Sequence, residues 1–503
     1  MRMAGWRLNP IHFAAACLVA VSCISARGQY DLPKPDEAAV ATLRRAVTKQ
    51  PDGSHVPLVF ALRQLRDPDL KPLFYQLAQS GDGQSQVQAV LALAEIDPTK
   101  KVDVWLISQI QDQAQEMVIA NALDLEMISP QQIEQILSQD SLNPMARLML
   151  MAEQLLAGQS NIDANELDVL SKSEDEYVAG FASILLAQLG QPAQWTAYQK
   201  TIEAQKLNSR TRLTLWLLDA IGRYKITKFS DWVRAQGTAS DADEAVTFRA
   251  VYAMLQMDPA AGLDLWSKAV GDKPSAGTQA RYALTLLAVS EDLPPQAFDR
   301  LRVAGADSLV LDMAEAGTAV ASDTDPSASL IALLKTGHLK TTDWVMTAVE
   351  DLKPEHAAKV YKFLIEQVDV STSAQTDPVG LATKSVAKLV EIDPSWVLER
   401  LRAAEDDSVL QQTLLLGMFQ SDSPLVGEAA AQVRRIGSGR ADSLALLLIA
   451  KHAKSLDPED LKKLGTIASG GGQVSDVLQV QAAWFYIKHT NNIQTALGSI
   501  FTK

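Results

Sequence analysis

The chain has 503 residues, 47% of them apolar and 6% aromatic, and a formal net charge of −14 at neutral pH. This acidity speaks against nucleic acid and anionic lipid as partners, because both select a basic protein face. Glycine and proline, with 26 and 21 residues, are slightly below average usage, so the composition favours helices over low-complexity disorder. A chain this long normally forms several globular domains, except in repeat proteins, where each repeat contacts only its neighbours.

The first 28 residues have the pattern of a secretory signal peptide. Arg2 and Arg7 give the segment a positive start, and the apolar run over residues 13–24 is too short to span a bilayer. The sequence Ser-Ala-Arg-Gly then provides small residues for cleavage before Gln29. We therefore expect an exported protein, either periplasmic or secreted.

Two alternatives to this cleavage stay open. The leader could remain as an N-terminal anchor, or cleavage before Cys23 could leave a lipid anchor on that residue, although Ala20 stands where bacterial lipoproteins usually have leucine. Both cysteines, Cys17 and Cys23, lie in the leader, so cleavage after Gly28 excludes thiolate nucleophiles and thiolate metal sites. No later run approaches eighteen apolar residues, so we expect no transmembrane segment after leader removal.

One ten-residue stretch occurs three times, at residues 89–98 (AVLALAEIDP), 250–259 (AVYAMLQMDP) and 385–394 (SVAKLVEIDP). Each copy has the apolar pattern of a helix end followed by Asp-Pro. Proline disfavours the α conformation in the residue before it, so the helix should stop at the aspartate. The same aspartate can cap a following helix whose first residue is the proline. The dipeptide therefore predicts a hinge that ends one helix and starts another.

From residue 36 onward the apolar spacing predicts an all-α chain of successive helices and no strand. Second helices of successive pairs end about every 31 to 34 residues as far as residue 291, which is the period of an α-solenoid. The predicted helices are 37–49, 56–65, 69–80, 84–96, 101–110, 112–125, 131–137, 145–156, 165–170, 174–189, 195–204, 209–224, 228–235, 241–257, 260–270, 275–289, 295–304, 307–319, 326–334, 341–352, 355–368, 377–392, 395–404, 406–420, 425–436, 442–456, 459–469, 473–489 and 493–501.

This pattern divides the chain into five segments. Trp105 and Trp266 each lie seven residues past a hinge proline, which supports real repetition. The polar runs over residues 321–329 and 371–380 are expected to be longer loops inside the stack. The expected segments are a signal peptide over 1–28, an N-terminal lead-in and cap helix over 29–56, regular repeats over 57–320, less regular repeats over 321–469 and a C-terminal capping hairpin over 470–503.

The paired helices and their Asp-Pro hinges resemble HEAT-like α-solenoid repeat proteins, in the broad sense of that class. The resemblance covers nearly all of the chain after the leader and identifies no subfamily. A tetratricopeptide repeat fits the period, but its Trp-Leu-Gly-Tyr pattern is absent. The resemblance implies a superhelical stack of antiparallel helical hairpins whose concave face binds other proteins.

Histidines and acidic clusters are the first candidates for chemistry. No histidine has another histidine or a cysteine three or four residues away, so no helical metal pair is expected. The acidic clusters lie where helices begin, and negative charge is favoured there by the helix dipole. We therefore expect isolated histidines and capping acids. The histidines after the leader are His55, His338, His356, His452 and His489, and the clusters are Glu174-Asp175-Glu176, Asp241-Asp243-Glu244 and Glu405-Asp406-Asp407.

The remaining motifs also favour structure over chemistry. The chain has no phosphate-binding loop, and Gly437-Ser438-Gly439 is too short for a nucleophile elbow. Arg434, Arg435 and Arg440 around it are expected to form a solvated helix end. Met145, Met149 and Met151 resemble a soft binding stripe, but Met145 and Met149, four residues apart on a helix, are expected in the core between repeats. Trp484-Phe485-Tyr486 is the densest aromatic cluster, and because consecutive residues point in different directions on a helix, we expect at most part of it to be buried.

The sequence contains no catalytic signature, so we expect no catalytic, cofactor-binding or metal-binding residues. The functional expectation is an exported, non-catalytic scaffold that binds one or more protein partners along an extended concave face. The alternative is an α/α-toroid enzyme that acts on a polysaccharide outside the cytoplasm. The low aromatic content and the lack of converging acids speak against this alternative.

Overall fold

The computed structural model describes residues 35–501, except 160–161, 240–242, 272–274, 303–305, 323, 369–376, 407, 422–438 and 472–473. These described residues form an all-α structure with no strand among them, which confirms the predicted fold class at that level. The expected signal peptide and the helix expected over residues 425–436 lie outside the described residues, as does most of the loop expected over residues 371–380.

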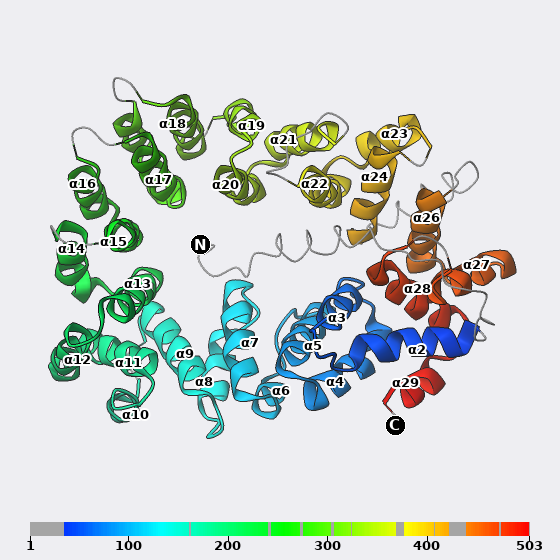
Figure 1. Cartoon of the computed structure of the whole chain (residues 1–503), viewed down its shortest axis with the longest axis horizontal. Helices are drawn as coiled ribbons and strands as arrows, with labels where there is room; N and C mark the ends of the chain where they lie inside the picture. The colour runs from blue at the N-terminus through cyan, green and yellow to red at the C-terminus, as the bar shows by residue number, and fades with distance from the viewer. Residues whose placement is uncertain are drawn as a thin grey trace. The chain divides into compact units, whose positions relative to one another are not determined.

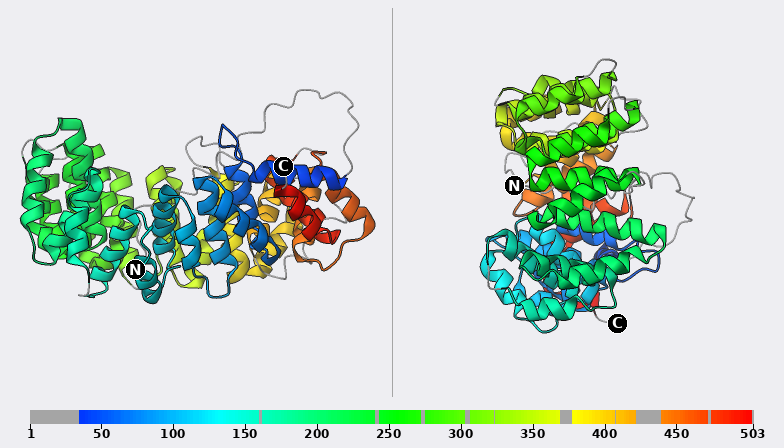
Figure 2. Two further views of the ribbon diagram at one scale, coloured as in Figure 1. Left: turned by 90° about the horizontal axis from the view of Figure 1, so that it is seen from below. Right: turned by 90° about the vertical axis from the view of Figure 1, so that its left-hand side faces the viewer.

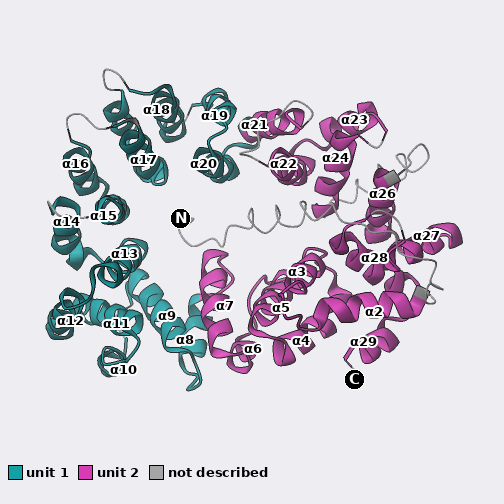
Figure 3. Ribbon diagram, viewed as in Figure 1, with its two compact units in different colours: residues 1–7, 130–356 teal, residues 8–129, 357–503 magenta. Residues whose placement is uncertain are grey.

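Two compact units divide the chain (Figure 3). The first unit holds residues 130–356. Its helices are α8 (Pro130–Leu137), α9 (Pro144–Leu156), α10 (Ala164–Leu170), α11 (Glu176–Gln188), α12 (Ala193–Glu203), α13 (Leu207–Arg223), η2 (Thr227–Phe229), α14 (Ser230–Thr238), α15 (Glu244–Met257), α16 (Pro259–Val270), α17 (Ala276–Leu287), η3 (Ser290–Asp292), η4 (Pro295–Leu301), α18 (Ser308–Ala321), α19 (Ser327–Lys335) and α20 (Leu339–Glu350).

The second unit contains both ends of the described chain, up to residue 129 and from residue 357. The helix α21 (Pro354–Glu366) crosses the boundary between the units. The other helices of the second unit are α2 (Pro35–Val47), α3 (Val56–Arg63), η1 (Pro68–Leu70), α4 (Lys71–Ser80), α5 (Gly83–Ile96), α6 (Val104–Gln109), α7 (Asp112–Asp124), α22 (Pro378–Ile392), α23 (Pro394–Ala403), α24 (Val409–Gln420), α26 (Gly439–His452), α27 (Pro458–Ala468), α28 (Asp476–His489) and α29 (Ile493–Phe501).

The hinge prediction is confirmed at two of its three copies. Asp258 ends α15 and caps α16, where its carboxylate accepts hydrogen bonds from the backbone N–H groups of Ala260 at 3.0 Å and Ala261 at 3.1 Å. Asp393 does the same between α22 and α23, and accepts from the N–H of Trp396 at 3.2 Å. In both copies the proline is the first residue of the second helix, where its missing N–H costs nothing.

The first copy ends a helix but does not start one. Asp97 ends α5, and its carboxylate then accepts hydrogen bonds from the N–H and hydroxyl of Thr99 in a turn. Lys100 has a φ of 51°, which no helix tolerates, and α6 begins only after Asp103 caps it. As a result Trp105 is 51% exposed, whereas Trp266 is buried in α16, so the two tryptophans are not structurally equivalent.

Loss of the hinge cap should be measurable at the second copy. Replacing Asp258 by alanine leaves two N–H groups of α16 without their acceptor and is expected to lower the free energy of unfolding by about 1 kcal/mol. Urea unfolding of the purified protein measures this change. Asp97→Ala is the control, since the Asp97 carboxylate accepts hydrogen bonds only from Thr99 in a turn and caps no following helix, and it should have the smaller effect. An equal loss in both variants would contradict the assignment of Asp258 as a cap.

Second helices pack on one another in rows. In the first unit α9, α11, α13, α15 and α17 each contact the next member of this series. In the second unit the corresponding row is α22, α24, α26, α28, α3, α5 and α7. The row therefore passes directly from the C-terminal helix α28 to the N-terminal helix α3. Figures 1 and 2 show α2 and α3, in blue, beside the red C-terminal helices. The N-terminal helix α2 also contacts α27, α28 and α29.

The helix α28 is enclosed on several sides. It contacts α2, α3, α26, α27 and α29. Trp484, Phe485 and Tyr486 are consequently all buried, with exposed fractions of 0%, 1% and 9%. The expectation that only part of this aromatic cluster is buried was wrong, because it assumed a helix with one solvent face.

Candidate functional site

Two of the three acidic clusters contribute helix caps in the described residues. Asp175 and Asp243 cap α11 and α15, which confirms the capping expectation for two of the acidic clusters. In the third cluster Glu405 and Asp406 are exposed, and Ser408 caps α24 instead. Asp241 and Asp407 lie outside the described residues. Within the described ranges, no group of three or more His, Cys, Asp or Glu side chains could hold a metal ion.

The methionines and His489 are described by burial and by one hydrogen bond. Met145 is buried, as expected of a core residue, whereas Met149 is only half-buried; Met151 is buried as well. The Nε2 atom of His489 donates to the carbonyl oxygen of Ala450 at 2.8 Å, since a carbonyl can only accept. Gly439 of the glycine turn and Arg440 of the arginine patch begin α26. The other members, Arg434, Arg435 and residues 437–438, lie outside the described residues.

A polar hollow of 480 Å³ lies in the second unit, at the turn between α4 and α5 and beside the start of α7. Its volume is in the range of small-molecule sites. Most of its walls are polar, unlike a typical ligand pocket. The lining side chains include Lys49, Asp82, Gln84, Gln111, Gln113 and Met117.

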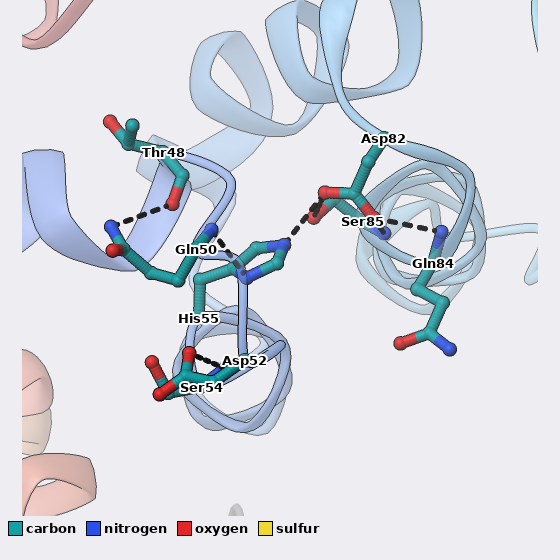
Figure 4. Close-up of polar contacts among 8 residues, drawn as sticks. All are labelled: Thr48, Gln50, Asp52, Ser54, His55, Asp82, Gln84 and Ser85. Carbon is teal, nitrogen blue, oxygen red and sulfur yellow. Dashed lines mark hydrogen bonds and ion pairs between the residues drawn. The ribbon is translucent and has the colours of Figure 1, made fainter.

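His55 lies next to this hollow and is tied to Asp82 (Figure 4). The His55 Nδ1 atom accepts a hydrogen bond from the backbone N–H of Gln50 at 3.1 Å. The proton of the neutral ring is therefore on Nε2, which donates to the Oδ2 atom of Asp82 at 2.7 Å. Both ring nitrogens are thus engaged, and the side chain is only 3% exposed. His55 cannot serve as a general base in this arrangement.

Asp82 is held by several donors at once. Besides His55, its carboxylate accepts hydrogen bonds from the N–H groups of Gln84 and Ser85, at 3.1 and 3.3 Å, and from the Ser85 hydroxyl at 2.8 Å. Burial acts to raise the pKa of the Asp82 carboxyl, but the hydrogen bonds from His55 and Ser85 outweigh it and lower the pKa. Asp82 therefore caps α5 and joins it to the turn before α3.

The lowered pKa of Asp82 predicts that the contact between α5 and the turn before α3 weakens in acid. A carboxyl whose pKa is lower in the folded protein stabilises the fold above its unfolded pKa, near 3.9, and this contribution is lost as the pH falls toward its folded pKa. We expect the unfolding free energy of the wild type to fall more steeply below about pH 4 than that of Asp82→Asn. Urea unfolding between pH 6 and pH 3 measures both slopes. Identical slopes would show that Asp82 does not contribute to acid sensitivity.

The wall of the hollow offers mainly hydrogen-bonding groups. The exposed amide groups of Gln84, Gln111 and Gln113 can donate and accept hydrogen bonds, and the ammonium group of Lys49 can donate them. The one carboxylate of the wall, Asp82, is already occupied as a cap. The sequence contains no signal for this hollow, because its side chains come from three separate segments and match no motif.

A second surface feature lies in the first unit, on consecutive second helices. Tyr177 of α11 and Trp216 of α13 form an edge-to-face pair with ring centroids 5.4 Å apart. Phe248 of α15 contacts Tyr282 of α17 in the same way, at 5.9 Å. Tyr177 is 37% exposed, and Trp216 and Phe248 are half-buried. We call Tyr177, Arg212, Trp216, Phe248, Arg249 and Arg281 the aromatic–arginine strip.

Ion pairs cross the same helices. Arg249 of α15 binds Asp219 of α13 at 2.8 Å, and Arg281 of α17 binds Glu244 of α15 at 3.0 Å. Burial raises the pKa of the Asp219 carboxyl, and the neighbouring Arg249 only partly offsets this effect. Arg212 is exposed on α13. The strip thus presents aromatic rings and guanidinium groups together on four consecutive second helices.

Comparisons with protein-family models, with curated proteins and with solved structures find no match to this chain. The HEAT-like resemblance therefore rests on the hinge residues and on the pairing of helices. Among the described residues, no helix is long and apolar enough to cross a membrane.

Proposed function

We propose that this chain is an exported, non-catalytic scaffold, built as a solenoid of HEAT-like repeats, which binds another protein through its second helices. The observation that carries the proposal is the aromatic–arginine strip. Tyrosine, tryptophan and arginine are the residues most enriched among those that dominate binding energy at protein interfaces. In repeat proteins such residues on successive repeats form one extended binding surface.

The ion pairs made by the arginines of the strip also fit a role in binding a protein partner. Arg249 and Arg281 are held by acids of the neighbouring helix, so their side chains are ordered before a partner arrives. Pre-ordered side chains lose less conformational entropy on binding, which favours affinity. The edge-to-face packing of Trp216 on Tyr177 and Phe181 fixes the aromatic rings in the same manner.

Affinity capture with matched variants tests this proposal. Tagged wild-type protein is recovered from the envelope of its native cells, beside Tyr177→Ala/Arg212→Glu in the strip and Trp105→Ala in α6. Trp105 is a matched control because it is an aromatic residue that is 51% exposed outside the strip. We expect one stoichiometric partner with the wild type and with Trp105→Ala, and its loss with the strip variant. Retention of the partner by the strip variant, or recovery of no partner, would contradict the proposal.

An α/α-toroid enzyme is the second candidate. The contact of α28 with α3 favours it, since a toroid requires the end of its chain to pack on the beginning. In the described chain, however, the polar hollow contains no pair of converging acids, and retaining or inverting hydrolysis needs two carboxyl groups. Release of reducing ends from envelope polysaccharides by the purified protein would support the enzyme and overturn the scaffold.

A further inference from the structure

The two ends of the described chain are joined by buried hydrogen bonds. The hydroxyl of Thr42 on α2 donates to the carbonyl oxygen of Ala468 on α27 at 3.0 Å. The side-chain amide of Gln481 on α28 donates to the carbonyl oxygen of Ala61 on α3, also at 3.0 Å. Buried polar groups are costly unless they are paired, so these bonds require one alignment of the two segments.

A charged cluster lies at the centre of this junction. The carboxylate of Asp67 is 6% exposed and accepts hydrogen bonds from the Nε1 atom of Trp484 at 2.9 Å and from the Nζ atom of Lys488 at 2.8 Å. Lys488 also contacts the carboxylate of Asp69 at 3.0 Å. Burial acts to lower the pKa of the Lys488 ammonium group, but hydrogen bonds to Asp67 and Asp69 outweigh it and raise the pKa.

The helix α2 takes most of its partners from the C-terminal end. It contacts α27, α28 and α29, and besides these α3. Ala39, Leu43 and Ala46 on α2 are fully buried. A chain that emerges N-terminus first therefore exposes this apolar face until residues 458–501 are present.

We propose that residues 35–70 form a strap that closes on the last helices of the chain, and that Asp67, Trp484 and Lys488 are the catch that fixes its position. In this arrangement α2 reaches its native packing only when α27, α28 and α29 are available. The catch selects one position of the strap on the C-terminal helices. In any other position Asp67 would be buried without Lys488 and Trp484, as an uncompensated charge.

Hydrogen exchange on the full chain tests the strap. We compare the wild type with Lys488→Met, which keeps an unbranched side chain shorter by one heavy atom and removes the charge. Lys362→Met is the matched control: Lys362 binds Asp393 at 2.7 Å and is 30% exposed, against 31% for Lys488, but its ion pair does not join the chain ends. Lys488→Met is expected to speed exchange about tenfold or more in α2, α27 and α28 together. Lys362→Met should leave these three helices unchanged.

Two results would overturn the strap. One is faster exchange in Lys488→Met confined to α28, with α2 unaffected, and the other is an equal effect of Lys362→Met on α2. Should Lys488→Met fail to fold, Asp67→Asn serves instead, since it keeps an acceptor for Trp484 and removes only the charge. It should speed exchange in the same three helices by a smaller factor, and unchanged exchange in α2 would refute the catch.

Discussion

Replacing Trp484 by alanine is expected to lower the free energy of unfolding of the second unit by about 4 kcal/mol. The indole is completely buried in α28, which is packed against α2, α3, α26 and α27. Truncation removes its apolar contacts, leaves a cavity and deprives the Asp67 carboxylate of a donor at 2.9 Å. Urea unfolding followed by far-ultraviolet circular dichroism measures the loss.

Two further variants separate the contributions at this position. Trp105→Ala removes the same side chain from an exposed site and should change stability by less than about 0.5 kcal/mol. Trp484→Phe keeps most of the packing but lacks the N–H donor, so its cost should be clearly smaller than that of alanine. A loss below about 1 kcal/mol for Trp484→Ala would show that the contact between the chain ends contributes little to the fold.

Replacing Gly417 by alanine is expected to destabilise the second unit by about 3 kcal/mol. Alanine normally favours a helix over glycine by about 1 kcal/mol, so the expected sign is the reverse of the helix propensity. A Cβ atom at this position of α24 would lie 2.4 Å from the Cβ atom of Val386 and 2.6 Å from the carbonyl oxygen of Thr383, both on α22. Neither atom is the end of a flexible side chain, so the two helices would have to separate.

Gly498→Ala is the control for this substitution. Gly498 is also inside a helix, α29, and a Cβ atom built there meets nothing within 4 Å. Its replacement should leave stability unchanged or raise it by up to about 1 kcal/mol, because only helix propensity acts. The midpoints of thermal unfolding report both changes. Equal midpoints of thermal unfolding for Gly417→Ala and Gly498→Ala would contradict the close approach of α22 and α24.

The helices could be predicted from the sequence because their signals are local. Apolar spacing and capping residues act within one or two turns, and they place α5, α16 and α22 within two residues of their observed bounds. The Asp-Pro hinge is also local, yet it was wrong at Asp97. There the following residues include Lys100 with a positive φ, and a turn replaced the helix that Pro98 was expected to start.

The junction of the chain ends could not be predicted, because it depends on pairs more than 400 residues apart. Nothing in the local sequence indicates that Asp67 binds Lys488, or that Gln481 reaches Ala61. The same reason applies to His55, which was expected to be an isolated histidine but is buried and bound to a carboxylate. Its partner Asp82 lies 27 residues away, and only the packing of α3 beside α5 brings the two together.

The central proposal is that the aromatic–arginine strip binds a protein partner, and site-specific photo-crosslinking in the native cells tests it most directly. A photoreactive amino acid is placed at position 212, on the exposed surface of α13, or at position 105, outside the strip. The proposal predicts one crosslinked protein of defined mass from position 212 and none from position 105. Absence of a crosslink at position 212, or the same crosslink at both positions, would contradict it.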